Sequence, residues 1–242
     1  MRLKKAVEYV LRDYPPLFRL ASKLYHRSDN SFKTLSPGLP QALETAFQKA
    51  IELNPGQAGD YYEFGLYRGY ALWKAQQICS QLGLRDTCFY GFDSFAGLPA
   101  VDGIDKSGNH FFEGQFACSQ QEVVRHLDTH GVDWSKTVLV KGYFDKSLTR
   151  KLRRQYPFKK VAVALIDCDL YSSTRDVLAW SRDLFADGSI LLFDDWYSYG
   201  DDPALGQQKA LFEFLDANRD FDVEFLIDFL YHGKAFILHR RE

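Results

Sequence analysis

The 242-residue sequence has no long apolar run and almost no net charge, and both absences limit what the protein can do. Every apolar run is well short of the ~18 residues that a membrane-spanning helix needs. Lys and Arg total 30 against 32 for Asp and Glu, so the net charge of −2 provides no basic surface for a nucleic-acid backbone. The N-terminal stretch places charged residues and prolines where a signal peptide needs an apolar core. We therefore expect a cytoplasmic protein without stable membrane insertion and without a nucleic-acid partner.

Cysteine is also scarce, and the four residues are far apart in the chain: Cys79, Cys88, Cys118 and Cys168. They form no C-x-x-C pair, and no histidine follows at the spacing of a zinc site. This pattern disfavours a zinc centre and a disulfide framework, and it predicts reduced thiols. Cys168 lies in an acidic motif, where a small residue at a strand end is the simpler interpretation.

Hydrophobic residues make up 46% of the chain, which is enough for a sizeable core, and they fall into short runs that alternate with helical patterns. This alternation predicts a mostly parallel sheet that is covered on both faces. The last two strands are joined through residues 230–233 without a helix, which predicts a hairpin and an antiparallel final strand. About seven strands with a C-terminal hairpin resemble the Rossmann-like α/β fold of class I methyltransferases. We expect strands at 60–64, 87–92, 137–142, 161–167, 189–195, 221–229 and 234–239, and helices at 69–82, 119–130, 147–155, 173–185 and 205–217.

The first 33 residues differ in character, because they are locally basic and carry apolar residues at helical spacing around Pro15-Pro16. They predict two short amphipathic helices. We divide the chain into an N-terminal helical extension, residues 1–40, and a main domain, residues 41–242. The extension is expected to pack on the main domain or on a second subunit of a homo-oligomer; contact with a membrane surface is the alternative.

The first predicted strand ends in a turn that suits a nucleoside ligand. Glu63 is followed by Gly65, which permits a tight turn, and by Gly69, which opens a helix whose positive N-terminus can face a polar ligand. The G-x-x-x-G spacing differs from the G-x-G-x-x-G of nicotinamide-dependent dehydrogenases. Asp93 ends the second strand about 30 residues after Glu63, where a carboxylate can accept hydrogen bonds from both ribose hydroxyls. The alternative role for Asp93 is to stabilise a turn or a helix end.

Four carboxylates follow two neighbouring strands. Asp167 and Asp169 come after one strand, and Asp194 and Asp195 come after the next. Adjacent parallel strands would bring these carboxylates to one edge of the sheet, where they repel one another unless protons or a cation compensate. Oxygen-only ligands predict a hard divalent cation, foremost Mg²⁺, with Ca²⁺ or Mn²⁺ as alternatives. The competing interpretation is that Asp169 and Asp195 cap the following helices.

These segments resemble the macrocin O-methyltransferase (TylF/MycF) family of S-adenosylmethionine-dependent class I methyltransferases, which methylate sugar hydroxyls of natural products. The resemblance covers about residues 60–215. It rests on EFGLYRG at 63–69, GFDSFAGLP at 91–99, GQFACSQQEV at 114–123, KGYF at 141–144, DCDLYSST at 167–174 and FDDW at 193–196.

The resemblance implies a role for each matching residue. The cofactor turn would consist of Glu63, Gly65 and Gly69, with Asp93 on the ribose of S-adenosylmethionine. The nucleoside pocket would be lined by Ser94, Gly142 and Tyr143. The metal would be held by Asp167, Asp194 and Asp195, and Asp169 would be the general base. Some members carry a histidine just after the paired aspartates, whereas this chain has Trp196 there, so His110 is the reserve candidate for the base.

A hydroxyl is a poor nucleophile at pH 7, so coordination by a cation and a neighbouring carboxylate base would divide the work of activating it. A hard cation suits a vicinal diol, on a sugar or on a catechol, and the resemblance favours the sugar. Two other functions compete. The D-x-D at 167–169 also fits a metal-dependent nucleotide-sugar glycosyltransferase, although the glycine turn and the second acidic pair disfavour it. A catalytically silent binding subunit is the other alternative, and it has no need for clustered carboxylates.

Overall fold

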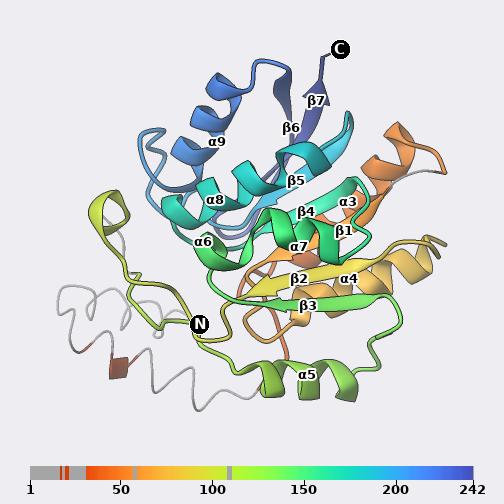
Figure 1. Cartoon of the computed structure of the whole chain (residues 1–242), viewed down its shortest axis with the longest axis horizontal. Helices are drawn as coiled ribbons and strands as arrows, with labels where there is room; N and C mark the ends of the chain where they lie inside the picture. The colour runs from red at the N-terminus through yellow and green to blue at the C-terminus, as the bar shows by residue number, and fades with distance from the viewer. Residues whose placement is uncertain (1–16, 18–19, 22–30, 57–58, 108–110, 242) are drawn as a thin grey trace.

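A computed structural model describes residues 17, 20–21, 31–56, 59–107 and 111–241. These residues contain a seven-stranded sheet with the order β3-β2-β1-β4-β5-β7-β6, shown in Figure 1. The first five strands run parallel, and β7 lies antiparallel to both β5 and β6. The predicted mostly parallel sheet with its C-terminal hairpin is therefore confirmed. The strands are β1 (Asp60–Phe64), β2 (Phe89–Asp93), β3 (Thr137–Lys141), β4 (Val161–Ile166), β5 (Ser189–Phe193), β6 (Phe221–Phe229) and β7 (Gly233–Arg240).

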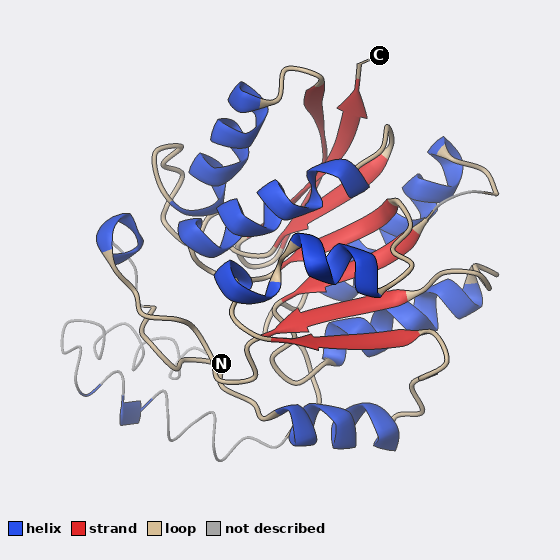
Figure 2. Ribbon diagram, viewed as in Figure 1, coloured by secondary structure: helices blue, strands red, loops and turns tan. Residues whose placement is uncertain are grey.

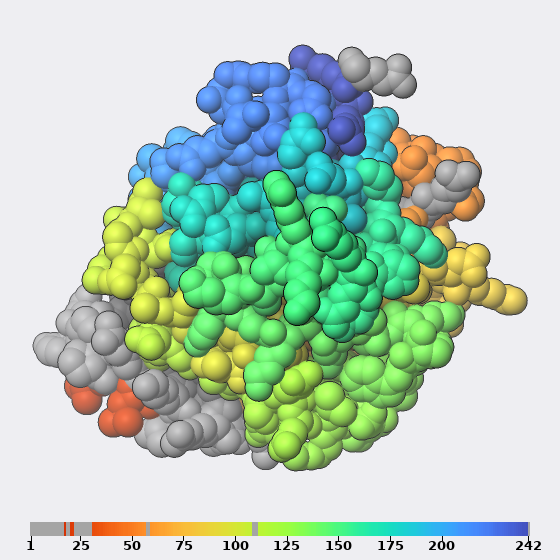
Figure 3. All heavy atoms as spheres, viewed as in Figure 1, coloured from red at the N-terminus to blue at the C-terminus, as the bar shows by residue number. Residues whose placement is uncertain are grey.

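Helices cover both faces of the sheet, and Figure 2 shows the resulting three layers. One apolar core lies between the sheet and the helices α3 (Leu39–Leu53), α4 (Tyr70–Gln81) and α5 (Gln120–Thr129). The other lies under α6 (Phe144–Ser147), α7 (Arg150–Gln155), α8 (Tyr171–Ser181) and α9 (Gly206–Ala217). In the space-filling view of Figure 3, the second group covers the near face of the sheet. Two 3₁₀ turns complete the set, η1 (Gly103–Lys106) and η2 (Arg182–Leu184).

The central strands of the sheet are buried on both faces. All residues of β1, β4 and β5 are buried, as expected for parallel strands with helices on both sides. The start of α5 carries a capping box, in which Ser119 accepts from the Glu122 N–H and the Glu122 carboxylate accepts from the Ser119 N–H. Local signals and burial thus agree over most of the main domain.

Two expected helices differ from the structure. Two short helices, α6 and α7, take the place of the helix expected at 147–155. The chain is interrupted at Thr149, which is the N-cap of α7 and whose side chain accepts a hydrogen bond from the Leu152 N–H. The helix expected at 173–185 begins earlier, at Tyr171, and its α-helical part ends at Ser181, where the 3₁₀ turn η2 takes over. The expected strand at 87–92 lies at 89–93 instead.

The sequence interpretation also missed α3, whose apolar residues recur at helical spacing and pack into the first core. This helix straddles the boundary expected between residues 40 and 41. The amphipathic helices expected around Pro15-Pro16 lie almost entirely outside the described residues. In the described part of the chain, no helix has the length and apolar character needed to cross a membrane.

Candidate active site

A cavity of about 1490 Å³ opens at the carboxyl ends of the parallel strands. Its lining includes most of the residues singled out from the sequence. These residues lie at or just after the ends of five different strands. Gly69 is not among the lining residues, and His110 lies outside the described residues. The predicted residues that line the cavity are Glu63, Gly65, Asp93, Ser94, Gly142, Tyr143, Asp167, Asp169, Asp194 and Asp195.

The turn after β1 needs glycine for two reasons. Gly65 has φ +95°, and a Cβ added there would lie 1.7 Å from the carbonyl oxygen of Asp167. The turn therefore packs directly against the end of β4. Gly69 has φ +82° and immediately precedes α4, where an added Cβ would crowd Val123 and Leu127 at 3.1–3.2 Å. Gly69 shapes the turn and seats α5 rather than facing the cavity.

Glu63 presents a buried carboxyl group to the cavity beside the turn after β1. Its Oε2 accepts a hydrogen bond of 2.7 Å from the Tyr61 hydroxyl, and its Oε1 is buried without a hydrogen-bond partner. Burial raises the pKa of Glu63 to about 8, and the charge of Asp93 adds to this, while the Tyr61 hydrogen bond opposes it. A buried oxygen without a partner is suited to a donor group on a ligand.

Asp93 holds the glycine turn in place. Its Oδ2 accepts from the N–H groups of Leu66 (2.7 Å) and Tyr67 (3.2 Å), and its Oδ1 accepts from the Phe95 N–H (2.6 Å). Burial raises the pKa of Asp93, and these three hydrogen bonds act in the opposite direction. The turn-stabilising alternative thus describes the contacts that the structure shows, and the ribose contact stays a prediction. Ser94 is also engaged locally, since its hydroxyl donates to the Gly97 carbonyl at 2.7 Å.

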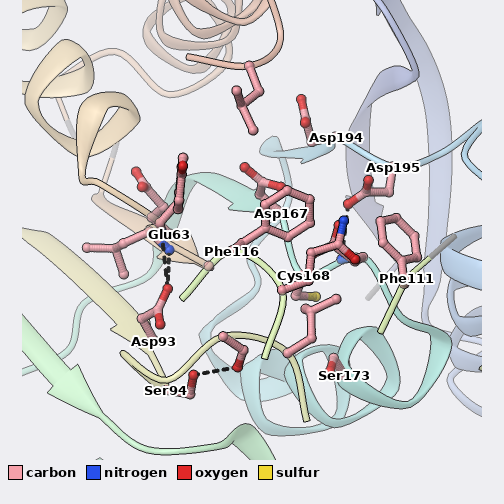
Figure 4. Close-up of a pocket in the computed structure, with 18 of the residues that line it drawn as sticks. Glu63, Asp93, Ser94, Phe111, Phe116, Asp167, Cys168, Ser173, Asp194 and Asp195 are labelled. Carbon is pink, nitrogen blue, oxygen red and sulfur yellow. Dashed lines mark hydrogen bonds between the residues drawn. The ribbon is translucent and has the colours of Figure 1, made fainter. Parts of the chain in front are cut away.

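The four predicted carboxylates lie at one edge of the sheet, because β4 and β5 are parallel neighbours that pair Ile166 with Phe193 at their ends. Figure 4 shows Asp167, Asp194 and Asp195 on the same side of the cavity. Burial raises the pKa of Asp167 well above its usual range, and the charges of Asp194 and Asp195 raise it further. The carboxyl groups of these two residues have pKa values raised to about 6 and about 7, in each case mainly by burial.

Each acid after β5 has its own hydrogen-bond partners. The Ser36 hydroxyl donates to Asp194 Oδ2 at 2.8 Å, whereas Asp194 Oδ1 is buried without a partner. Asp195 Oδ2 accepts from the Asp169 N–H at 3.0 Å, and its Oδ1 accepts from the Ser198 hydroxyl at 3.1 Å. The Gln207 side chain accepts from the Asp195 N–H and donates to the Ile166 carbonyl, which ties α9 to the ends of β4 and β5.

The capping alternative for Asp169 and Asp195 is wrong. The residues at the N-caps of α8 and α9 are Leu170 and Leu205, and neither of them caps its helix with its own side chain. The N–H of Tyr171 at the start of α8 donates instead to Asp105 of η1, at 2.7 Å. This contact anchors the long loop after β2 beside the site.

The donor chemistry at this edge suits a hard cation. Asp194 and Asp195 contact the hydroxyls of Ser36 and Ser198 and the N–H of Asp169, and Asp194 Oδ1 is buried without a hydrogen-bond partner. Within the described ranges, however, no three His, Cys, Asp or Glu side chains are arranged so that they could hold a single metal ion. Part of the reason is geometric, since oxygens of Asp194 and Asp195 are turned toward Ser36, Ser198 and the Asp169 N–H. The predicted ligand set therefore stays a prediction.

Aromatic side chains lie between the turn after β1 and the acids that follow β4 and β5. Phe116 lies 6.0 Å from Tyr67 and 6.5 Å from Phe111 between ring centroids, and Phe111 lies 6.1 Å from Tyr199. Figure 4 places Phe116 between the side of Glu63 and Asp93 and the side of the acidic cluster. The row therefore supplies apolar surface for a ligand that reaches from one half to the other.

The family model of macrocin-O-methyltransferase (TylF) matches residues 39–210, which is most of the chain. The chain belongs to this family. The resemblance inferred from the sequence motifs is thus confirmed.

Among curated proteins, the chain is 26% identical over 151 residues to mycinamicin III 3''-O-methyltransferase from Micromonospora griseorubida. That match covers 60% of this chain and 58% of the relative. The chain is also 29% identical over 143 residues to demethyldecarbamoylnovobiocin O-methyltransferase from Streptomyces niveus. This second match covers 57% of this chain and 53% of the relative. The matched region thus spans little more than half the length of either relative.

Among solved structures, the O-methyltransferase NovP superposes with a TM-score of 0.67 at 23% identity, covering 84% of this chain and 79% of that chain. At this level of identity the match concerns the fold, and it confirms the class I methyltransferase architecture expected from the strand pattern.

Proposed function

We propose that this protein is an S-adenosylmethionine-dependent O-methyltransferase that methylates a hydroxyl of a sugar in a diol-bearing metabolite. The observation that carries the proposal is a single cavity in which the glycine turn after β1 faces four carboxylates that follow β4 and β5. Family membership supports the reaction type, and two relatives that act on mycinamicin and novobiocin intermediates support an acceptor of this class.

The cofactor side of the site would bind S-adenosylmethionine, which supplies an electrophilic methyl group on its sulfonium. Gly65 lines the cavity and lets the turn pack against the backbone of Asp167, and the buried Oε1 of Glu63, which has no hydrogen-bond partner, offers an acceptor. Asp93 fixes the turn through three N–H groups and keeps oxygen lone pairs for a ribose hydroxyl. Ser94, Gly142 and Tyr143 line the same cavity.

The acidic side would position and deprotonate the acceptor. Asp169 is the proposed general base, and Asp167, Asp194 and Asp195 are the proposed ligands of Mg²⁺, which would stabilise negative charge on the acceptor oxygen when bound. Burial and neighbouring acids raise the pKa of Asp169 well above its usual range, which makes it a stronger base than an exposed aspartate. Neighbouring acceptor oxygens would be oriented by the acids on one side and by the aromatic row on the other.

The two alternative functions lose support. A nucleotide-sugar glycosyltransferase does not account for the family match or for the turn that Asp93 holds. A silent binding subunit does not account for the four carboxylates that the parallel pairing of β4 and β5 gathers at one side of the cavity, because a scaffold without catalysis has no need to hold mutually repelling acids together.

The test is methyl transfer from radiolabelled S-adenosylmethionine to matched acceptors. Sugars and catechols with a vicinal diol are compared with deoxy analogues that lack the second hydroxyl, with Mg²⁺ and with EDTA. We expect turnover with diol sugars that EDTA abolishes and Mg²⁺ restores. Equal turnover of the deoxy analogues would contradict the diol acceptor, and full activity in EDTA would contradict the metal. Binding of a nucleoside diphosphate but not of S-adenosylhomocysteine would contradict the methyltransferase assignment.

A further inference from the structure

Tyr61 and Glu63 lie two residues apart on β1, so their side chains leave the same face of the sheet. The Tyr61 ring is fully buried in the first core. It packs against Phe47 of α3, with 5.8 Å between ring centroids, and against Phe89 of β2, with 6.0 Å. Its backbone belongs to a strand that is paired on both sides, with β2 and with β4. The core and the sheet thus hold the Tyr61 hydroxyl in a fixed place.

The Tyr61 hydroxyl holds one oxygen of Glu63 and leaves the other to the cavity. It donates to Glu63 Oε2 at 2.7 Å, whereas Oε1 is buried and has no hydrogen-bond partner among the described residues. Burial raises the pKa of Tyr61 well above its usual range, and the charge of Glu63 adds to this, so the hydroxyl keeps its proton and stays a donor. The two oxygens of a carboxylate are rigidly linked, so a donor on Oε2 restricts where Oε1 points.

The chemistry of Glu63 selects among the donor groups that S-adenosylmethionine carries. These are the amino group of adenine, the ribose hydroxyls and the α-ammonium of the methionine part. Figure 4 shows Glu63 and Asp93 on one side of the cavity, and Asp93 is the proposed partner of the ribose. Only the ammonium has both a positive charge and hydrogens to donate, since the sulfonium has no N–H or O–H. A carboxylate that is 1% exposed gains most from such a charged donor.

We propose that Tyr61 is a positioning residue that aims Glu63 Oε1 at the α-ammonium of the bound cofactor. The proposal rests on the proposed function, which supplies S-adenosylmethionine as the ligand. The Tyr61 hydrogen bond also opposes the rise in the pKa of Glu63 that burial causes. Without it, Glu63 would be more fully protonated and a weaker partner for a cation. Loss of the Tyr61 hydroxyl should therefore affect ligands that have the amino-acid part and spare those that lack it.

The experiment compares two ligands by calorimetry at pH 8. S-adenosylhomocysteine carries the ammonium, whereas 5′-methylthioadenosine has the same nucleoside and thioether without the amino-acid part. Tyr61→Phe keeps the buried ring and should weaken S-adenosylhomocysteine binding about threefold to tenfold, the effect of one hydrogen bond. Its affinity for 5′-methylthioadenosine should be unchanged.

Two variants of Glu63 test the link between the two residues. In a Glu63→Gln background, Tyr61→Phe should cause little further loss, because the hydroxyl acts through the carboxylate. Glu63→Asp keeps the charge but shortens the side chain by one methylene, away from the hydroxyl. It should show the selective loss for S-adenosylhomocysteine with Tyr61 intact, which tests the geometry without changing the core.

Tyr62→Phe is the matched control, since Tyr62 is a fully buried neighbour on β1 whose hydroxyl donates to the Lys159 carbonyl at 2.6 Å. It should lower the melting temperature and leave both affinities unchanged. Unchanged S-adenosylhomocysteine affinity in Tyr61→Phe would overturn the role of Tyr61 alone. Equal losses for the two ligands, or the same loss in Tyr62→Phe, would also overturn it, because the hydroxyl would then support the strand in general. Failure of the wild type to bind S-adenosylhomocysteine would overturn the proposed function itself.

Discussion

Asp169 has an unusual backbone that accounts for its place in the site. Its φ is +62°, in the left-handed region that residues other than glycine rarely adopt. This conformation lets its N–H donate to Asp195 Oδ2 while Cys168, the residue before it, packs in the core under α8. Strained residues of this kind concentrate at functional sites. The backbone of Asp169 thus orients Asp195, and the residue lines the cavity.

The base role of Asp169 is tested by Asp169→Asn. Asparagine tolerates the left-handed region, so the variant removes the carboxylate without adding strain. We expect the rate of methyl transfer to fall about 10²–10⁴-fold, the range for a lost general base. Affinities for S-adenosylhomocysteine and Mn²⁺, measured by calorimetry, should change little. Near-normal turnover would move the role elsewhere, with His110 as the next candidate.

Asp93→Ala separates two roles of Asp93. Loss of its hydrogen bonds to the Leu66, Tyr67 and Phe95 N–H groups should loosen the turn. We expect S-adenosylhomocysteine to bind about tenfold or more weakly, from a loss of about 1.5–3 kcal/mol. A 2′,3′-dideoxy analogue should lose less than the parent ligand, because only the parent offers hydroxyls to the carboxylate. Equal losses would assign Asp93 to the turn alone, and unchanged affinities would exclude both roles.

The site residues that the sequence revealed are those next to a recognisable strand end. Glu63, Asp93 and the four acids each follow an apolar run, so their common edge could be predicted. Ser36 and Gln207 could not be found this way, because their roles depend on contacts with residues 158 and 12 positions away. The sequence also could not show that the Asp93 oxygens face backbone N–H groups, since that depends on how the turn folds back.

At the scale of elements, the turn after β1 and the end of β4 form one unit. Gly65 donates its N–H to the Phe92 carbonyl, and the Asp167 N–H donates to the Phe64 carbonyl, each at 2.9 Å. The ends of β1, β2 and β4 are therefore fixed relative to one another. A movement of the turn after β1 would therefore also move Asp167, the first acid of the cluster.

Gly65→Ala should therefore affect both halves of the site. Its Cβ would collide with the Asp167 carbonyl at 1.7 Å, in addition to the strain of φ +95°. The matched control is Gly83→Ala, which has φ +75° with nothing within 4 Å of an added Cβ and should lose about 1–2 kcal/mol from backbone strain alone. We expect Gly65→Ala to be clearly less stable than the control in urea unfolding and to bind neither S-adenosylhomocysteine nor Mn²⁺ normally. Equal stability of the two variants would contradict the close contact.

Strands were easier to predict than helices for a physical reason. The fully buried strands β4 (VAVALI) and β5 (SILLF) appear as nearly continuous apolar runs, which fixes their positions within about two residues, and β1 (DYYEF) is marked by its aromatic residues. Helix ends depend on single capping contacts, such as Thr149 at α7 and Asp105 at α8, and the second of these comes from a distant loop. The helix α3 was not predicted although LPQALETAFQKAIEL carries a helical apolar pattern, since its N-cap is Gly38 and neither a side-chain cap nor an acidic first turn marks where it begins.

For the whole molecule, the parallel order of the central strands concentrates acids in one buried place. Glu63, Asp167, Asp194 and Asp195 all have raised pKa values, mainly because of burial. In unfolded chains, aspartate and glutamate titrate near pH 4. Between about pH 4 and pH 8 the folded protein therefore binds more protons than the unfolded chain. Its stability must fall as pH rises through this range, since a higher proton count in the folded state gives a negative slope.

We expect the melting temperature of metal-free protein to decrease between pH 5 and pH 8, with about 2–4 °C for each kcal/mol lost. The decrease should be steepest near pH 5–6, where Asp194 and Asp195 are still largely protonated in the folded protein but not in the unfolded chain. Their contribution to the slope should weaken over pH 6–7, where they lose their protons at pKa values of about 6 and about 7. Because a cation binds the deprotonated acids, the increase produced by Mg²⁺ should grow over the same interval. Calorimetric scans of wild type and the Asp194→Asn/Asp195→Asn double variant isolate this contribution from other titrating groups. An Mg²⁺ effect that is independent of pH, or that persists in the double variant, would show that these acids do not hold the cation.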